Sequence, residues 1–294
     1  MAFDRWIPIH NASFPFRVFK QYNAELNRLN MAYQAAFRYS FSQLGINGAK
    51  PEDKAIEFLY THNDDKLTIK KWAQGFNDFD NYLRLNNLMA MLSYFETYIA
   101  SIISLAIDSD PGIILSSPHS IDGAKLLKEG ITSLTKDEKG AYLKGCTKGD
   151  WQARIVHMKR LFGTIPASFD AELSNLEKMR VLRNNVGHAF GRDIESARII
   201  SSANTTPMEI LYKERFIKYQ KIIRQLARQL NDHLQINHIG NYQYLYHYQS
   251  IYDDIYHIDR FVRMNRLKKS LGQSKNIPYS KEFCMWVVDY YESL

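Results

Sequence analysis

Residues 180–192, which read RVLRNNVGHAFGR, bring an arginine, an amide and a histidine into one short segment. Asn184 and His188 are four residues apart, so in a helix they lie nearly on the same face. Arg183 is five residues before His188, about 140° round the helix, and its long side chain can reach the same place. A guanidinium binds phosphate in a bidentate manner, and an imidazole exchanges protons near neutral pH. This set of side chains suits the cleavage of a phosphodiester.

The same segment is also typical of an ordinary helix end. Gly187 or Gly191 can act as a C-cap, and His188 can interact with the last carbonyl groups of the helix. An arginine five residues before a histidine also occurs by chance in many proteins. The spacing alone is therefore compatible with a phosphodiester-cleaving site and with an ordinary helix end.

Hydrophobic periodicity predicts helices along almost the whole chain, and local signals predict where several of them begin. The longest predicted helices cover residues 16–44, 78–107, 206–238 and 242–271. N-caps are predicted at Thr135, Asp150, Asp170, Thr206 and Ser280, with Thr206-Pro207-x-Glu209 as a capping box. Shorter helices are expected near Pro51 and after Asp64-Asp65. The sequence has no convincing strand pattern, repeat or low-complexity tract, which predicts an all-α protein.

The motif and its flanking helices resemble the HEPN superfamily (higher eukaryotes and prokaryotes nucleotide-binding), which carries an Arg-x(4–6)-His signature. Arg183 and His188 match the signature, and Asn184 matches the Asn, His or Asp that often follows the Arg. A long apolar helix before the motif and a long helix after it extend the resemblance over about residues 78–240. It implies a HEPN-like helical bundle over 78–240.

The rest of the chain falls outside the resemblance. We expect residues 1–75 to form an N-terminal helical extension and residues 241–294 to form C-terminal helices packed on the core. The resemblance also gives the motif residues their roles. Arg183 would stabilise the charge developing on the scissile phosphate, His188 would act as general acid or base, and Asn184 would orient His188 or the phosphate.

Some members of the superfamily have a polar residue on the first long helix that faces the motif. Glu96 is the corresponding candidate here, because it interrupts the apolar stripe beside Phe95 and Ile99. A carboxylate on the flank of a surface helix is an equally good interpretation of Glu96.

Many HEPN domains are metal-independent endoribonucleases that act as homodimers in toxin–antitoxin, anti-phage or RNA-processing systems. The resemblance therefore implies an endoribonuclease in a bacterial cytoplasm, with RNA as substrate, an antitoxin or regulatory protein as a further partner, and neither a metal nor another cofactor. A catalytically silent helical module that binds RNA, nucleotide or a protein is the alternative. A structural subunit whose basic half docks on nucleic acid is a third.

The charge distribution points to a polyanionic partner. The formal net charge of +7 lies wholly in residues 151–294, since residues 1–150 are neutral overall. Nucleic acid is the simplest such partner, and a solvated basic face is the alternative. The side chains expected to contact RNA are Arg180, Arg192, Lys218, Lys221, Arg224 and Arg228. The tyrosines between 242 and 256 could stack on bases, although packing between helices accounts for them more simply.

Composition and missing motifs exclude other classes. The chain has two cysteines, Cys146 and Cys284, so neither a disulfide framework nor a cysteine-rich zinc site is expected. P-loop, GxGxxG, HExxH and GxSxG motifs are absent. Histidine spacing does not predict a metal site. The apolar stretch 89–107 contains five polar residues, which predicts a buried helix and no membrane span.

Overall fold

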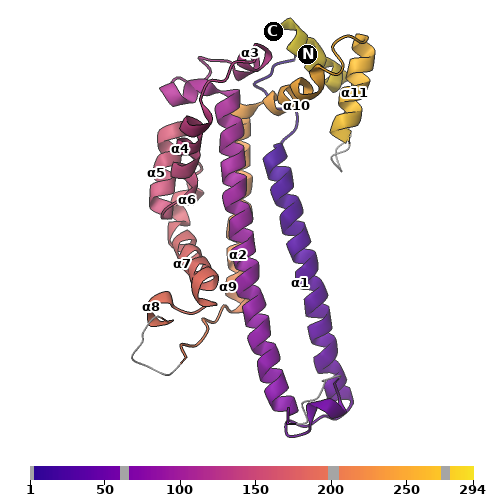
Figure 1. Ribbon diagram of the computed structural model, residues 1–294, viewed down its shortest axis with the longest axis vertical. Coiled ribbons are helices and arrows are strands. Elements are labelled where there is room, and N and C mark those ends of the chain that lie inside the picture. Colours follow the sequence, from indigo (N-terminus) through magenta and orange to yellow (C-terminus); the bar gives the residue numbers. More distant parts are fainter. Residues whose placement is uncertain (1–2, 60–65, 198–204, 273–278) are drawn as a thin grey trace. The chain divides into compact units, whose positions relative to one another are not determined.

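The computed structural model describes residues 3–59, 66–197, 205–272 and 279–294 (Figure 1). Within these ranges the protein is all-α, as predicted: it has helices and short turns, and no strand beyond an isolated bridge between Lys54 and Thr68. The predicted short helix after Asp64-Asp65 begins outside the described residues. The fold class is therefore confirmed.

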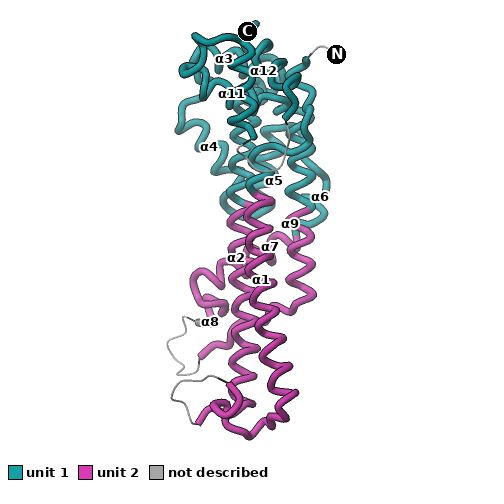
Figure 2. The backbone as a smooth tube through the Cα atoms, turned by 90° about the vertical axis from the view of Figure 1, so that its right-hand side faces the viewer, with its two compact units in different colours: residues 1–18, 96–173, 225–294 teal, residues 19–95, 174–224 magenta. Residues whose placement is uncertain are grey.

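The chain forms two compact units (Figure 2). Unit 1 comprises residues 1–18, 96–173 and 225–294, and unit 2 comprises residues 19–95 and 174–224. The unit boundaries lie within four helices: α1 (Phe14–Ile46), α2 (Ile69–Ser109), α7 (Leu173–Ala189) and α9 (Lys213–Leu234). The predicted division into segments 1–75, 78–240 and 241–294 rests on the resemblance and stays a prediction.

Unit 2 contains most of α1, the first parts of α2 and α9 and nearly all of α7, together with η1 (Ala55–Glu57) and α8 (Ile194–Ala197). Aromatic pairs hold α1 and α2 side by side, since the rings of Tyr22 and Tyr94 stack with centroids 4.9 Å apart. Further along, Phe37 of α1 stacks on Phe76 of α2 at 5.0 Å, and Phe41 of α1 lies 5.4 Å from Trp72 of α2. Such pairs add about 0.5–1.5 kcal/mol each beyond the area that they bury.

Unit 1 holds the remaining elements: η2 (Pro111–Leu115), α3 (Gly123–Lys128), α4 (Lys136–Thr147), α5 (Trp151–Phe162), α6 (Ser168–Ala171), η3 (Gln235–Ile239), α10 (Tyr242–Tyr252), α11 (Arg260–Gly272) and α12 (Lys281–Ser293). One of its cores joins α10, α11 and α12. The rings of Tyr244 and Tyr248 are fully buried in that core, against Phe283 and Tyr291. These two tyrosines therefore pack between helices, as the simpler interpretation expected.

Most of the predicted helix starts are confirmed. Thr135 and Glu138 form a reciprocal capping box at α4, and the Asp150 side chain accepts a hydrogen bond from the Ala153 N–H at α5. Ser280 caps α12 in the same way. Asp170 was wrongly predicted as a cap, since it lies inside α6 and its carboxylate pairs with Lys159 at 2.8 Å.

Three of the predicted long helices differ from the structure. The helix expected over 242–271 is divided into α10 and α11, because the side chain of Asp259 accepts the Phe261 N–H and starts a new helix. The helix expected from Thr206 begins only at Lys213. Residues 205–212 have no helical structure, and other parts of unit 2 bond several of their backbone groups.

Helix α2 is longer than predicted, since it starts at Ile69 and not at Asp78. By length and composition it is the one helix in the described ranges that could cross a membrane, and half of its most apolar window is buried inside the protein. The core helix of a soluble protein passes the same test, so this feature is weak evidence for a membrane span.

Candidate functional site

The motif lies in the last turns of α7. This helix carries four buried side chains at intervals of three, spread over about half of its circumference: Leu176, Met179, Leu182 and Asn185. These residues fix the rotation of the helix about its axis, because they pack into the protein. His188 consequently lies on an exposed side, and Arg183 and Asn184 are partly buried.

The structure brings two of the three motif side chains into contact. Nη1 of Arg183 donates a hydrogen bond to Oδ1 of Asn184 at 3.2 Å. His188 stands four residues beyond Asn184 on the same helix, so the two side chains lie on nearly the same face. The last turns of α7 thus carry a guanidinium bonded to an amide and, on the face of that amide, an accessible imidazole.

Helix α7 ends in a left-handed turn. Phe190 has φ of 55° and Gly191 has φ of 76°, and the Gly191 N–H donates to the Asn185 carbonyl oxygen at 2.9 Å. Glycine adopts this backbone conformation without a steric penalty, so Gly191 is the helix-ending glycine. Gly187 instead lies inside α7, and a Cβ built on it would meet no described atom within 4 Å.

Aromatic and basic side chains follow the motif directly. The ring of Phe190 is 56% exposed and stacks on Tyr82 with centroids 5.0 Å apart, and the Arg192 guanidinium lies 5.3 Å from the Phe190 centroid. Nε of Arg192 donates to the Thr206 carbonyl oxygen at 2.7 Å. Among the predicted RNA contacts, Arg192 thus has a structural role as well.

Residues 205–211 run beside the motif and are held by α2. The Asn81 side chain donates to the Glu209 carbonyl and accepts from the Leu211 N–H, both at 2.9 Å. Nε of Arg84 donates to the Leu211 carbonyl at 2.7 Å, and the Glu209 N–H donates to the Gly191 carbonyl at 2.8 Å. Sequence reasoning missed Asn81 and Arg84, because their partners are about 130 residues away along the chain.

The predicted basic stripe of α9 is exposed. Lys218, Lys221 and Arg224 face solvent in unit 2, while Phe216, Tyr219 and Ile223 on the opposite side are buried. Arg228 follows in unit 1, exposed, with Nε 3.8 Å from the Asp232 carboxylate. Arg180 pairs with Glu177 on α7 at 2.7 Å. An exposed basic stripe is compatible with an RNA path and with a solvated face.

Glu96 belongs to unit 1, whereas the motif belongs to unit 2. Its Oε1 accepts a hydrogen bond from Nη1 of Arg154 at 2.9 Å, and Arg154 is only 4% exposed. The Arg154 guanidinium also lies 4.6 Å from the Trp151 ring centroid. Removing one partner of such a buried pair leaves an uncompensated charge, so Glu96 has a structural role in unit 1. Its catalytic role stays a prediction.

Comparison with known proteins returned no matching family model, no matching curated protein and no matching solved structure.

Proposed function

We propose that the protein is a metal-independent endoribonuclease of the HEPN type, in which Arg183, Asn184 and His188 act on RNA. The observation that carries the proposal is the exposed imidazole of His188 on the same helix face as Asn184, whose side chain is hydrogen-bonded to Arg183. The Arg-Asn-x3-His sequence matches the superfamily signature. Bacterial cytoplasm and an antitoxin or other regulatory partner belong to the same proposal.

The side chains supply acid–base and electrostatic catalysis. The motif contains no carboxylate to hold magnesium, so the RNA 2′-hydroxyl is the best nucleophile available. Its attack on the adjacent phosphorus breaks the bond to the 5′-oxygen of the next nucleotide. The products are a 2′,3′-cyclic phosphate and a 5′-hydroxyl. Arg183 stabilises the pentacoordinate phosphorane, and its hydrogen bond to Asn184 orients the guanidinium for that purpose.

Proton transfer calls for two groups, one that deprotonates the nucleophile and one that protonates the leaving oxygen. Each chain contributes one histidine to the motif, so a homodimer with the motif at its two-fold axis would supply both. The exposed Phe190 and the open space at Gly187 provide a surface on which a second copy can pack.

RNA cleavage by Arg183→Ala, Arg183→Lys and His188→Ala, measured in EDTA, tests the proposal. Loss of one transition-state contact costs about 10²–10³ in rate, and lysine cannot restore a bidentate contact. We expect all three variants to lose cleavage while their helical circular dichroism is unchanged.

Lys178→Ala, an exposed position on the same helix, is the matched control and should cleave normally. If the wild-type protein does not cleave RNA, and the variants bind RNA as tightly as wild type does, the result would instead support the silent RNA-binding module. The exposed stripe of α9 favours that second function.

A further inference from the structure

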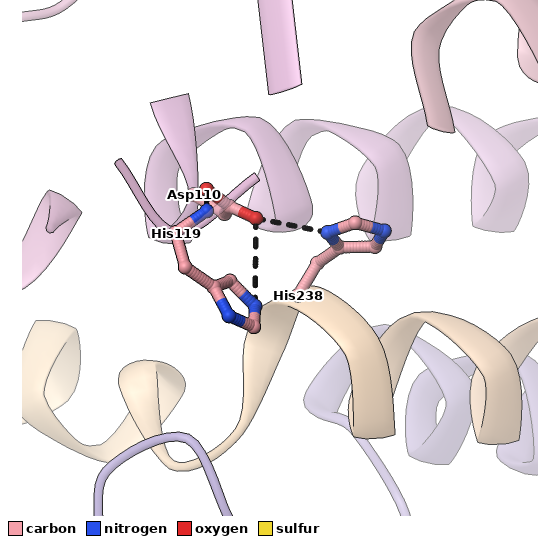
Figure 3. Close-up of side chains that lie close together, drawn as sticks. All are labelled: Asp110, His119 and His238. Atoms are coloured by element: carbon pink, nitrogen blue, oxygen red, sulfur yellow. Dashed lines mark hydrogen bonds and ion pairs between the residues drawn. The ribbon is translucent and has the colours of Figure 1, made fainter. Parts of the chain in front are cut away.

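Unit 1 contains a cluster of potential metal ligands that the nuclease proposal does not use. Asp110, His119 and His238 each offer one ligand atom, and these atoms all lie within 4.8 Å of one another. Figure 3 shows both imidazoles directed at the same carboxylate oxygen of Asp110. Oδ2 of Asp110 is 2.9 Å from Nδ1 of His238 and 3.8 Å from Nε2 of His119.

We propose that Asp110, His119 and His238 bind a zinc ion. Two imidazole nitrogens and one carboxylate oxygen form a common zinc ligand set, with bonds of roughly 2.0–2.2 Å. A tetrahedral site with such bonds separates its ligand atoms by about 3.4 Å. The two measured separations lie on either side of that value, so small side-chain rotations close the site.

The burial of the three side chains fits a site that is closed on one side and open on the other. Asp110 is 0% exposed and His238 is 5% exposed, whereas His119 is 47% exposed. A buried carboxylate is costly unless it is paired, and a dication neutralises it. The exposed side of His119 gives the ion an entry path and leaves the fourth position to water.

The backbone beneath the ligands is unusual at two places. His119 has φ of 64°, a left-handed backbone conformation that is uncommon for residues other than glycine. Its N–H donates to Oδ1 of Asp110 at 2.8 Å. His238 lies in η3, a π-helical turn at the end of α9. Strained residues and π-turns are both concentrated at functional sites.

A second layer of contacts orients both imidazoles. The Trp6 ring packs on His119 with centroids 4.1 Å apart, and Phe162 lies 5.2 Å from His238. The Ser109 hydroxyl donates to the His238 carbonyl at 2.7 Å, and Arg5 donates to that hydroxyl at 2.7 Å. Supporting contacts of this kind hold metal ligands in place.

Zinc binding would replace two hydrogen bonds of the imidazoles. Nδ1 of His238 bonds Asp110, and Nε2 of His119 bonds the Asn237 carbonyl oxygen at 2.7 Å. Each neutral ring would bind the ion through that nitrogen, with its single proton on the other nitrogen. The ion would join the 110–119 segment to the end of α9 and stabilise unit 1.

Zinc chloride titrated into EDTA-treated, dialysed full-length protein tests the site by calorimetry and thermal melting. We expect one zinc ion per chain and a rise in melting temperature. His119→Ala is the main variant, because its exposed side chain can be removed without opening a core. This substitution should weaken zinc binding at least ~10-fold, because losing even a residue that supports a ligand has an effect of that size. It should also abolish the rise in melting temperature. Asp110→Asn should do the same.

His257→Ala removes an exposed histidine elsewhere in unit 1 and should bind zinc as wild type does. No binding by wild-type protein would overturn the proposal and leave the cluster as a hydrogen-bonded Asp–His pair. Equal affinity in wild type, His119→Ala and Asp110→Asn would overturn it as well, because the zinc would then lie elsewhere. The nuclease proposal is unaffected by either outcome, since it uses no residue of this cluster.

Discussion

The side-chain oxygen of Asn81 accepts a hydrogen bond from the backbone N–H of Leu211 at 2.9 Å, and its amide nitrogen donates to the Glu209 carbonyl. One amide therefore satisfies a donor and an acceptor in a segment that has no helical hydrogen bonds. Asn81→Ala leaves both backbone groups without this partner. Because an unsatisfied buried group costs about 1–3 kcal/mol, we expect a loss of that size in the free energy of unfolding, measured in urea.

Asn86→Ala on the same helix is the control for this substitution. The Asn86 side chain donates to the Tyr82 carbonyl within α2, and it is partly exposed. We expect a much smaller loss of stability there. Equal losses in the two variants would mean that Asn81 does not hold the segment that follows the motif.

The features predicted best were those that depend on residues close together in the sequence. The capping box at Thr135 and the caps at Asp150 and Ser280 are local hydrogen bonds between a side chain and the next turn. The Arg183–His188 motif is also local, so its helix and the helix end at Gly191 could be predicted.

The sequence could not reveal features that depend on distant partners. Thr206-Pro207-x-Glu209 has every local signal of a helix start. The Asn81 amide, however, donates to the Glu209 carbonyl and the Glu209 N–H donates to the Gly191 carbonyl, which holds these residues in another conformation. The spacing of Asp110, His119 and His238 along the sequence does not indicate a metal site, because His238 is far from the other two in the chain.

Substitution of Gly187 tests the dimer. A side chain at Gly187 meets no described atom within 4 Å of its Cβ, so it should not disturb the single chain. Gly187→Gln should even favour the helix by about 0.5–1 kcal/mol, since glycine is a poor helix former. If a second copy packs there, the variant should be monomeric in light scattering and lose RNA cleavage.

Gly140→Gln is a matched control, because Gly140 also lies inside a helix with open space at its Cβ. It should leave the oligomeric state and the cleavage rate unchanged. A Gly187→Gln monomer that still cleaves RNA would remove the need for two histidines at one active site.

The salt dependence of RNA binding tests the stripe on α9. Contacts with phosphate release counterions, so the logarithm of affinity falls with the logarithm of salt concentration by roughly 0.7 per contact on a single strand. Replacing Lys218, Lys221, Arg224 and Arg228 by glutamine should therefore reduce the slope by about 3. Fluorescence anisotropy with a labelled RNA measures it.

The control for this experiment has the same change in charge at exposed lysines of unit 1: Lys125, Lys136, Lys144 and Lys148. Their replacement should leave the slope nearly unchanged. If the two quadruple variants lose the same amount, the effect is one of net charge and the RNA path lies elsewhere.

His10 should make stability depend on pH. Burial lowers the pKa of His10, and the positive charge of Arg17 lowers it further. The ring packs among Tyr244, Tyr279 and Phe283. In the unfolded chain the His10 imidazole binds a proton at about pH 6.5, whereas in the folded chain it binds a proton only at lower pH. The free energy of unfolding should therefore fall as the pH drops from about 7 through 6.5 towards the lower pKa of folded His10.

His10→Phe removes this titration and keeps an aromatic ring in the same surroundings. We expect a smaller loss of melting temperature between pH 7 and pH 5 than in wild type. Part of the loss should remain, because burial also lowers the pKa values of His233 and His247. An unchanged pH profile in His10→Phe would show that His10 does not contribute.

Cleavage of an RNA with one 2′-deoxy nucleotide at the cut site tests the central claim most directly. If His188 and Arg183 direct attack by the 2′-hydroxyl, that single substitution should stop cleavage there, while the all-ribose RNA gives a 2′,3′-cyclic phosphate and a 5′-hydroxyl in the presence of EDTA. Cleavage of the 2′-deoxy substrate, or products with a 5′-phosphate, would contradict the account.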